Sequence, residues 1–254
     1  MRTVRRVEPD RASPRLWRRR FDEREELWTE AVGRLPPVYG ETWVERDGRR
    51  LRRFEPARSK LAAAIAADWT GPLPRPGERW LYLGAASGTT ASHVADLVGP
   101  SGSVYALERS VRPFARLLAT SERYPNLLPI LGDARVPETY ADLVPVVAGL
   151  YADVAQPDQA EIVRKNAELL LAGAGAAVLV ALKTPSMGRE HGPARHRATA
   201  ESALSGFLDL ERAVRLDPFH RGHYMVGGVV RDDRPGVRGP VTPPSGTTRG
   251  RRRS

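Results

Sequence analysis

The sequence predicts an α/β protein built around a doubly wound parallel sheet, and three observations lead to this fold class. Short apolar runs alternate with amphipathic segments of helical length between residues 79 and 182. The runs are apolar throughout, as in strands that are buried on both faces of a sheet. The chain of 254 residues is 41% hydrophobic and 28% charged, which suits a globular protein with a sizeable core. Regular strand–helix alternation favours parallel strands covered by helices.

The elements of this sheet are expected in a fixed order. An alanine-rich helix at Lys60–Trp69 precedes it and is ended by Gly71–Pro72. The expected parallel strands are Arg79–Leu83, Ser103–Leu107, Leu127–Leu131, Val146–Ala152 and Ala176–Leu182. The expected helices between them are Thr89–Val98, Val111–Tyr124 and Gln156–Leu171. Two late apolar runs predict a terminal antiparallel hairpin, formed by Leu208–Leu216 and His223–Val230.

The N-terminal region is dense in Arg, Glu and Trp and lacks a clear run of strands. We expect a short helix at Trp17–Gly33, and a hairpin of Val38–Trp43 with Leu51–Phe54 around Asp47–Gly48. The chain is therefore divided into a basic arm (1–37), a small β-rich N-terminal subdomain (38–55), the α/β domain (56–231) and a tail (232–254). The tail is rich in Pro, Gly and Arg, and is expected to be disordered.

The charge balance points to a polyanionic partner. Forty basic residues against thirty acidic ones give a net charge of +10, which favours nucleic acid, with a merely solvated basic surface as the alternative. The only lysines are Lys60, Lys165 and Lys183. Arginine does not lose its proton in proteins, so a lysine in such a chain is a candidate for chemistry that arginine cannot perform, or else a chance survivor.

Several classes of protein are excluded or disfavoured. The absence of cysteine rules out disulfides, thiolate metal sites and cysteine nucleophiles, and no cluster of metal ligands is evident. The longest apolar run, Leu169–Leu182, is interrupted by glycines and is too short to span a membrane. The basic N-terminus is not followed by an apolar stretch, so it does not have the pattern of a secretory signal. We therefore expect a cytoplasmic protein with no membrane association.

Ligand-binding residues are sought after each strand, because open α/β sheets bind ligands beyond the carboxyl ends of their strands. A small-residue turn that runs from Gly84 and Ala85 to Thr89 and Thr90 follows the first strand, although it is not the GxGxxG of dinucleotide enzymes. The next two strands are followed by carboxylates. These are Glu108, suited to ribose hydroxyls, and Asp133 beside Ala134, suited to an adenine amino group. This layout is that of Rossmann-like S-adenosylmethionine-dependent methyltransferases.

The remaining two strands end in further polar residues. Asp153, Val154, Ala155 and Gln156 follow the fourth strand, and Lys183 ends the fifth. A desolvated lysine oriented by a carboxylate can act as a general base near neutral pH, so Lys183 beside Asp153 is the expected base, with a structural ion pair as the alternative. Lys165 lies in a predicted helix near two glutamates, and we expect it to be an ordinary surface residue.

These residues resemble the fibrillarin family of RNA 2′-O-methyltransferases. The resemblance runs from about Val38 to Val230 and is carried by RSKLAAAI at Arg58–Ile65, LYLGAASGTTASHV at Leu81–Val94, Asp133–Arg135, DVAQPDQA at Asp153–Ala160 and Asn166–Ala167. It implies a catalytic tetrad of Lys60, Asp153, Lys183 and His223. It also implies S-adenosyl-L-methionine contacts at Thr89, Thr90, Glu108, Arg109, Asp133, Ala134 and from Asp153 to Gln156. Gly222 stands where the family has an acidic residue before the histidine, so His220 is a possible substitute.

The resemblance also implies partners. An archaeal-type member methylates rRNA or tRNA within a C/D-box guide-RNA particle, together with a Nop-type scaffold protein and a kink-turn RNA-binding protein. Lys60 and His223 would then place the ribose or a neighbouring phosphate while Lys183 takes the proton of the 2′-hydroxyl. Two other functions stay open at this point: methylation of a protein glutamine or a small molecule, and a non-catalytic role as a ribonucleoprotein subunit.

Overall fold

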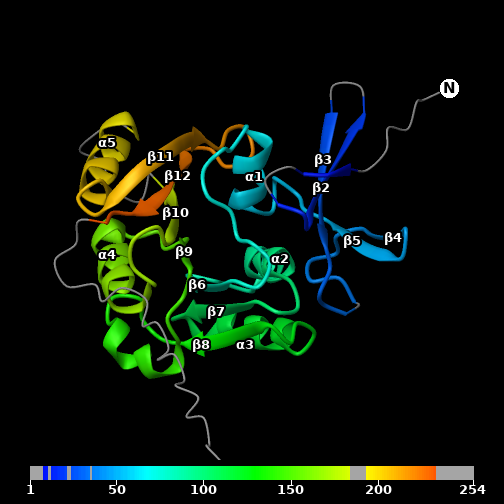
Figure 1. The fold of residues 1–254 in the computed structure, drawn as a ribbon, viewed down its shortest axis with the longest axis horizontal. Helices are drawn as coiled ribbons and strands as arrows, with labels where there is room; N and C mark the ends of the chain where they lie inside the picture. The colour runs from blue at the N-terminus through cyan, green and yellow to red at the C-terminus, as the bar shows by residue number, and fades with distance from the viewer. Residues whose placement is uncertain (1–7, 11–12, 22–23, 35, 184–192, 233–254) are drawn as a thin grey trace, which may run out of the picture.

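The computed structural model describes residues 8–10, 13–21, 24–34, 36–183 and 193–232, which form two packed units (Figure 1). A smaller N-terminal antiparallel sheet lies beside a larger α/β unit. The expected tail from residue 233, and the segment that follows Lys183, lie outside the described residues. Among the described residues, no helix has the length and apolar character needed to cross a membrane.

The larger unit contains a seven-stranded sheet in the order β11-β12-β10-β9-β6-β7-β8. Its parallel strands are β6 (Arg79–Leu83), β7 (Ser103–Glu108), β8 (Leu127–Leu131), β9 (Gly149–Ala152) and β10 (Ala177–Lys183). The antiparallel hairpin of β11 (Leu208–Arg215) and β12 (His223–Val230) completes one edge. The predicted doubly wound sheet and its terminal hairpin are therefore confirmed.

The order of the strands creates a switch point in the sheet. The chain runs outward from β6 through β7 to β8, and then returns to place β9 on the other side of β6. Loops that leave the carboxyl ends of β6 and β9 therefore diverge, and the space between them is where such sheets bind ligands. At the other side of β9, β10 pairs with β12 in a register that sets Lys183 opposite His223.

Helices cover both faces of the sheet. One face carries α1 (Lys60–Ala66), α2 (Thr89–Val98) and α3 (Val111–Ser121), and its core includes Trp80 and Tyr151, both fully buried. The other face carries α4 (Gln159–Leu170) and α5 (Pro193–Leu204), together with the 3-10 turns η1 (Pro137–Thr139) and η2 (Ala141–Leu143). Helix α5 was not among the predicted elements.

The helix expected at Trp17–Gly33 is wrong, because this region forms strands of the N-terminal unit. Its sheet has the order β1-β2-β3-β5-β4, formed by Glu8–Pro9, Leu16–Phe21, Arg24–Glu30, Arg49–Arg53 and Trp43–Arg46 in that order. Alternate residues of β3 point to opposite faces: Leu27 packs into the core of the larger unit, whereas Trp28 packs on the outer face. Both faces thus bury apolar residues, which hid the two-residue period of a strand.

The turn predicted at Asp47–Gly48 is found, and it joins β4 to β5, but the first strand is Trp43–Arg46 and not the predicted Val38–Trp43. Both turn residues have a positive φ, 51° and 73°, as a two-residue hairpin turn of this twist requires. The strands β1 to β3 come from the region expected to be an arm, and they pair into the same sheet as this hairpin. The sheet therefore extends across the expected boundary at residue 37.

A buried polar network joins the two units. The guanidinium of Arg52, fully buried on β5, lies 3.3 Å from the carboxylate of Asp96 on α2 and 3.5 Å from that of Glu41. It also donates to the hydroxyls of Ser92 and Tyr124. Burial raises the pKa of Asp96 to about 6 despite the opposing effect of Arg52. The network fixes α2 against the N-terminal sheet, and α2 begins at the loop described next.

Candidate functional site

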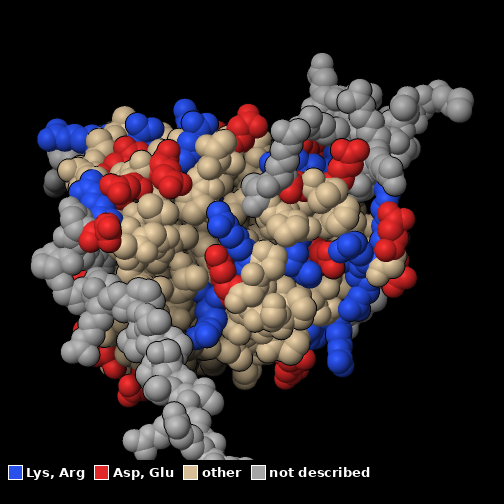
Figure 2. Space-filling model, viewed as in Figure 1, with Lys and Arg blue, Asp and Glu red and all other residues tan. Residues whose placement is uncertain are grey.

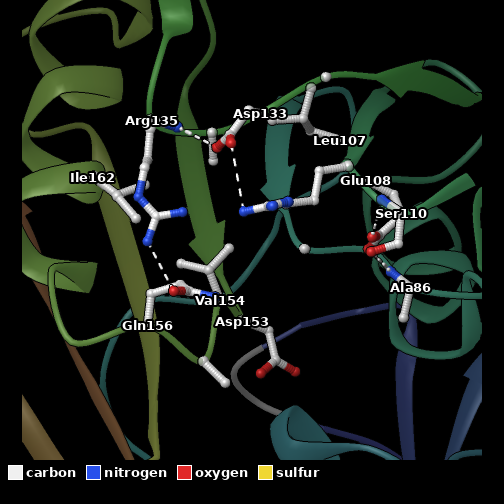
Figure 3. Close-up of a pocket in the computed structure, with 15 residues that line it drawn as sticks. Ala86, Leu107, Glu108, Ser110, Asp133, Arg135, Asp153, Val154, Gln156 and Ile162 are labelled. Atoms are coloured by element: carbon white, nitrogen blue, oxygen red, sulfur yellow. Dashed lines mark hydrogen bonds and ion pairs between the residues drawn. The ribbon is translucent and has the colours of Figure 1, made fainter. Parts of the chain in front are cut away.

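A pocket opens at the carboxyl ends of β6, β7, β8 and β9, at the switch point of the sheet (Figure 3). It encloses about 670 Å³, part of which is open to solvent. The side chains and backbone that line it are those of Gly84, Ala86, Leu107, Glu108, Arg109, Ser110, Gly132, Asp133, Ala134, Arg135, Asp153, Val154, Ala155, Gln156 and Ile162. Its position is the one that the strand-end rule predicts.

The floor of the pocket is the turn between β6 and α2. Gly84, Ala86 and Gly88 all have positive φ angles, of 78°, 48° and 88°. The amides of Gly84 and Ala85 both donate to the carbonyl of Leu107, at 2.9 Å, which holds the turn against β7. A Cβ on Gly84 would lie 2.6 Å from the carbonyl oxygen of Asp153, so the close approach of the two strand ends requires glycine.

We therefore expect Gly84→Ala to destabilise the fold by roughly 2–4 kcal/mol, because it adds an overpacked contact to a strained φ. Urea unfolding followed by circular dichroism measures this loss. Gly40→Ala is the matched control, since Gly40 has a similar φ of 87° but nothing within 4 Å of an added Cβ. An equal loss in the two variants would show that the contact with Asp153 has no energetic weight.

Glu108, at the end of β7, is fixed by two backbone amides. Its Oε2 accepts from the amide of Ala86 at 2.9 Å, and its Oε1 accepts from the amide of Ser110 at 2.8 Å. A carboxylate has about four acceptor positions, so each oxygen keeps one for a ligand. The side chain is only 9% exposed and lines the pocket, so it offers a rigid acceptor to a ligand hydroxyl.

Asp133, beyond the end of β8, is the second carboxylate of the pocket. Its Oδ1 accepts from the amide of Arg135 at 3.0 Å, and its Oδ2 lies 3.5 Å from Nη1 of Arg109 (Figure 3). The side chain of Arg135 crosses to the far wall, where it donates to Gln156 at 2.8 Å and forms an ion pair with Asp158. Hydrogen bonding to Arg135 lowers the pKa of Asp158. The wall is thus held together by polar contacts between two loops.

A second group of residues lies at the edge of the pocket nearest α1. Nζ of Lys60 donates to both oxygens of Asp153, at 2.6 and 2.7 Å. Lys60 begins α1, whose N-cap Ser59 accepts from the amide of Ala62 and from the hydroxyl of Thr90. The cap therefore links the start of α1 to the first turn of α2. Asp153 belongs both to this pair and to the pocket lining.

The expected contact between Lys183 and Asp153 is not found among the described residues. Asp153 is instead paired with Lys60, a residue 93 positions away in the chain, because α1 is folded over the carboxyl edge of the sheet. The side chain of Lys183 is exposed at the end of β10 and makes no hydrogen bond or ion pair with a described residue. It lies opposite His223 across the β10–β12 pair.

His223 has the character of a neutral imidazole. Burial lowers its pKa, and the nearby ammonium of Lys60 acts in the same direction. Nδ1 lies 3.0 Å from the carbonyl of Arg221 and donates to it, which leaves Nε2 as the acceptor. His220, the possible substitute, donates instead to the carbonyl of Pro56 at 2.8 Å. It therefore ties the β11–β12 loop to the segment before α1.

Most of the sequence-predicted binding residues line this one pocket: Gly84, Glu108, Arg109, Asp133, Ala134, Asp153, Val154, Ala155 and Gln156. Ala85, Thr89 and Thr90 lie in the adjoining turn and first helical turn and are absent from the lining. Sequence reasoning missed Arg135 and Ile162, whose side chains reach the pocket from a loop and from α4. No group of carboxylates and histidines among the described residues could hold a metal ion.

The comparisons with known proteins agree with this geometry. The family model that matches, Fibrillarin, covers residues 7–232. The chain is 43% identical over 195 residues to a fibrillarin-like rRNA/tRNA 2′-O-methyltransferase of Aeropyrum pernix, a match over 76% of this chain and 83% of the relative. It is 41% identical over 191 residues to an rRNA 2′-O-methyltransferase fibrillarin of Tetrahymena thermophila, over 74% of this chain and 65% of the relative.

Solved structures are similar as well. A Methanococcus jannaschii fibrillarin pre-rRNA processing protein has a TM-score of 0.84 at 32% identity, over 90% of this chain and 99% of that one. Aeropyrum pernix fibrillarin, solved with natively bound S-adenosyl-L-methionine, has a TM-score of 0.80 at 39% identity, over 90% and 100%. A structure of a fibrillarin/Nop5p complex has a TM-score of 0.73 at 36% identity, over 81% and 94%.

Proposed function

The chain belongs to the fibrillarin family, and from this premise we propose that it is an S-adenosylmethionine-dependent RNA ribose 2′-O-methyltransferase. The relatives that match it along most of its length carry that activity in their names. The observation in this structure that carries the proposal is the placement of Lys60 and Asp153 as an ion pair at the rim of the strand-end pocket. A methyl donor and a hydroxyl acceptor can meet at such a rim.

The pocket fits S-adenosylmethionine by the chemistry of its walls. Glu108 offers a fixed carboxylate to the ribose hydroxyls, and Asp133 offers one to the adenine amino group. Leu107, Val154 and Ile162 provide apolar surface for the purine ring. When bound, the cofactor supplies a methyl carbon made electrophilic by its sulfonium. Holding donor and acceptor in line supplies a large part of the rate in such transfers.

The residues at the rim act on the acceptor hydroxyl. A ribose 2′-hydroxyl is a weak nucleophile, so a base within hydrogen-bond distance must take its proton as it attacks. The ammonium of Lys60 is committed to Asp153 as a donor, and the pair fixes the carboxylate at the rim. We assign proton acceptance to the amine of Lys183, which ends β10 opposite His223 and is exposed, instead of being desolvated beside Asp153 as the sequence predicts.

His223 is the second candidate for the proton acceptor, because Nε2 of its neutral ring is free to accept. The two assignments differ in their dependence on pH. If His223 is the base, the rate rises with pH through the lowered pKa of this histidine and is level above pH 7. If Lys183 is the base, the rate continues to rise above neutral pH.

The proposed particle contains guide RNA, a target rRNA or tRNA, a Nop-type scaffold and a kink-turn RNA-binding protein. A relative with the same fold is known in complex with Nop5p, which supports the scaffold. Figure 2 shows acidic side chains interspersed among the basic ones on the visible face. Eleven basic and four acidic residues lie outside the described ranges, so most of the net charge of +10 belongs to those segments. We propose that they add sequence-independent affinity for RNA.

The test is methyl transfer in a reconstituted particle. The full chain is combined with radiolabelled S-adenosylmethionine, a Nop-type scaffold, a kink-turn RNA-binding protein, a C/D-box guide and its target. We expect label on one ribose 2′-oxygen of the target, lost when the guide is omitted. Label that survives ribonuclease treatment would instead indicate a protein or small-molecule acceptor. Cofactor binding without transfer to any acceptor would indicate a non-catalytic subunit.

A substitution tests the assignment of the adenine end of the pocket. Asp133→Ala removes the proposed acceptor for the adenine amino group and should weaken binding of S-adenosylhomocysteine by about 1–3 kcal/mol. Calorimetric titration measures this change, and the melting temperature of the free protein should be nearly that of the parent because Asp133 is partly exposed. Asp142→Ala, an exposed carboxylate outside the pocket lining, is the control. Parental affinity in folded Asp133→Ala would remove the adenine assignment.

A further inference from the structure

We propose that His220 is a positioning residue of the rim, a clasp that holds the loop leading into His223 against the segment leading into Lys60. Its side chain reaches the backbone of Pro56, just before α1, and its own backbone holds His223. This inference rests on the proposed function, since it concerns the rate of transfer to an acceptor hydroxyl. It goes beyond that function by assigning part of the rate to a residue outside the pocket lining.

The side chain of His220 contacts the backbone before α1. Its Nε2 lies 2.8 Å from the carbonyl oxygen of Pro56, a residue 164 positions away in the chain. A carbonyl oxygen only accepts, so Nε2 must carry the proton and donate it. The β11–β12 loop and α1 lie side by side at this edge of the sheet, where α1 packs against β12 (Figure 1). The hydrogen bond therefore fixes the loop to the segment that leads into Lys60.

The start of α1 is anchored on a second side, by the first turn of α2. Oγ of the N-cap Ser59 accepts from the amide of Ala62 at 3.3 Å and from the hydroxyl of Thr90 at 3.1 Å. Thr90 follows the turn that forms the floor of the pocket. Two separate elements thus set the position of Lys60, because Thr90 ties the start of α1 to the pocket and His220 ties it to the β11–β12 loop.

The orientation of His223 depends on the backbone of the same loop. Its amide donates to the carbonyl of His220 at 3.1 Å, and its Nδ1 donates to the carbonyl of Arg221 at 3.0 Å. Gly222 has no side chain that could orient the ring instead. The ammonium of Lys60 lies close enough to this ring to lower its pKa. A shift of the loop would therefore move Nε2 of His223 relative to that ammonium.

Either role of His223 depends on this placement. The ring accepts the proton or places the ribose, and both roles require it to stay within hydrogen-bond distance of the acceptor. A displacement of about 1 Å can cost roughly a hundred-fold in rate. One hydrogen bond at a partly exposed site, in contrast, contributes little to the stability of a fold. Loss of the clasp should therefore slow methyl transfer much more than it destabilises the protein.

The experiment moves the hydrogen-bond donor along the side chain. Single-turnover methylation in the reconstituted particle, with cofactor and RNA at saturation, is compared for the parent, His220→Ala, His220→Gln and His220→Asn. The amide nitrogen of Gln can occupy the position of Nε2, whereas that of Asn falls short of the carbonyl of Pro56. We expect His220→Ala and His220→Asn to be slower by roughly ten-fold, and His220→Gln to keep most of the parental rate. Affinity for S-adenosylhomocysteine should be parental in all three, because His220 lies outside the pocket lining, and their melting temperatures should lie close together.

A second measurement observes the clasp in the free protein, without RNA. Nitrogen-15 NMR of the imidazoles distinguishes a proton on Nδ1 from a proton on Nε2. In the parent we expect the proton of His220 on Nε2 and that of His223 on Nδ1. His220→Ala should shift the His223 signals towards those of a ring that exchanges between the two tautomers, and His220→Gln should leave them near their parental values.

Three results would overturn the clasp: parental turnover by His220→Ala, equal rates for His220→Gln and His220→Asn, and His223 signals that are the same in all variants. Glu211→Gln, at an exposed position of β11 outside the pocket lining, is the control and should keep the parental rate. If the parental particle transfers no methyl group to RNA, the proposed function fails, whereas parental transfer that is insensitive to His220 overturns the clasp alone.

Discussion

Lys183→Arg should lose methyl transfer by roughly a hundred-fold or more, the contribution expected of a general base. Arginine keeps the positive charge at the end of β10 but cannot release its proton at working pH. Cofactor affinity should be unchanged, because Lys183 does not line the pocket, and RNA affinity should be nearly unchanged. Single-turnover methylation in the reconstituted particle measures the rate, and calorimetry measures the cofactor affinity.

Lys165→Arg is the matched control. Lys165 is exposed on α4, outside the pocket lining, so its replacement should leave the rate at the parental level. Raising the pH should increase the rate of the parent but not restore Lys183→Arg. Near-parental turnover by Lys183→Arg, with a pH profile that is level above pH 7, would move the base to His223. His223→Gln would then be expected to abolish the pH dependence below pH 7.

The α/β unit could be predicted from sequence because its signals are local. Strands β6, β8 and β12 have the bounds that the sequence predicts, because each is an almost uninterrupted apolar run, although β8 at the edge of the sheet leaves Leu128 and Leu131 exposed. Helix α5 was missed because its buried stripe is His196, Ala200 and Leu204, of which only Leu204 is a large apolar residue. The N-terminal sheet depends on pairing between β3 and β5, a long-range contact that a local pattern does not contain.

The residues of the site likewise fall into those that local sequence predicts and those that depend on long-range packing. Glu108, Asp133 and Asp153 were predictable because each follows a parallel strand, and the topology brings strand ends together. The partner of Asp153 was not predictable in this way: Lys183 ends a strand, whereas Lys60 begins a helix that precedes the sheet, and only the packing of α1 brings Lys60 to Asp153. Arg135 was missed because its role depends on where a long side chain reaches across the loops.

Arg52→Leu should destabilise the protein by about 3–5 kcal/mol, because it leaves two buried carboxylates without their counter-ion. Arg52, Glu41 and Asp96 have side chains with no exposed surface, so water cannot replace the guanidinium. Urea unfolding at pH 7.5 measures the loss. Arg164→Leu is the control, since Arg164 forms exposed ion pairs on α4 and its loss should cost about 1 kcal/mol or less.

The loss should also depend on pH, with a sign that follows from the burial of Asp96. Burial already raises the pKa of this carboxyl to about 6 in the presence of Arg52, and the guanidinium opposes that rise. Without Arg52, the folded state retains protons on Asp96 and Glu41 that the unfolded chain releases above about pH 4. Folded Arg52→Leu therefore binds more protons than its unfolded state, and its stability falls as pH rises. The deficit relative to the parent should accordingly be larger at pH 8 than at pH 5, and a deficit independent of pH would show that the arginine acts by packing rather than by charge.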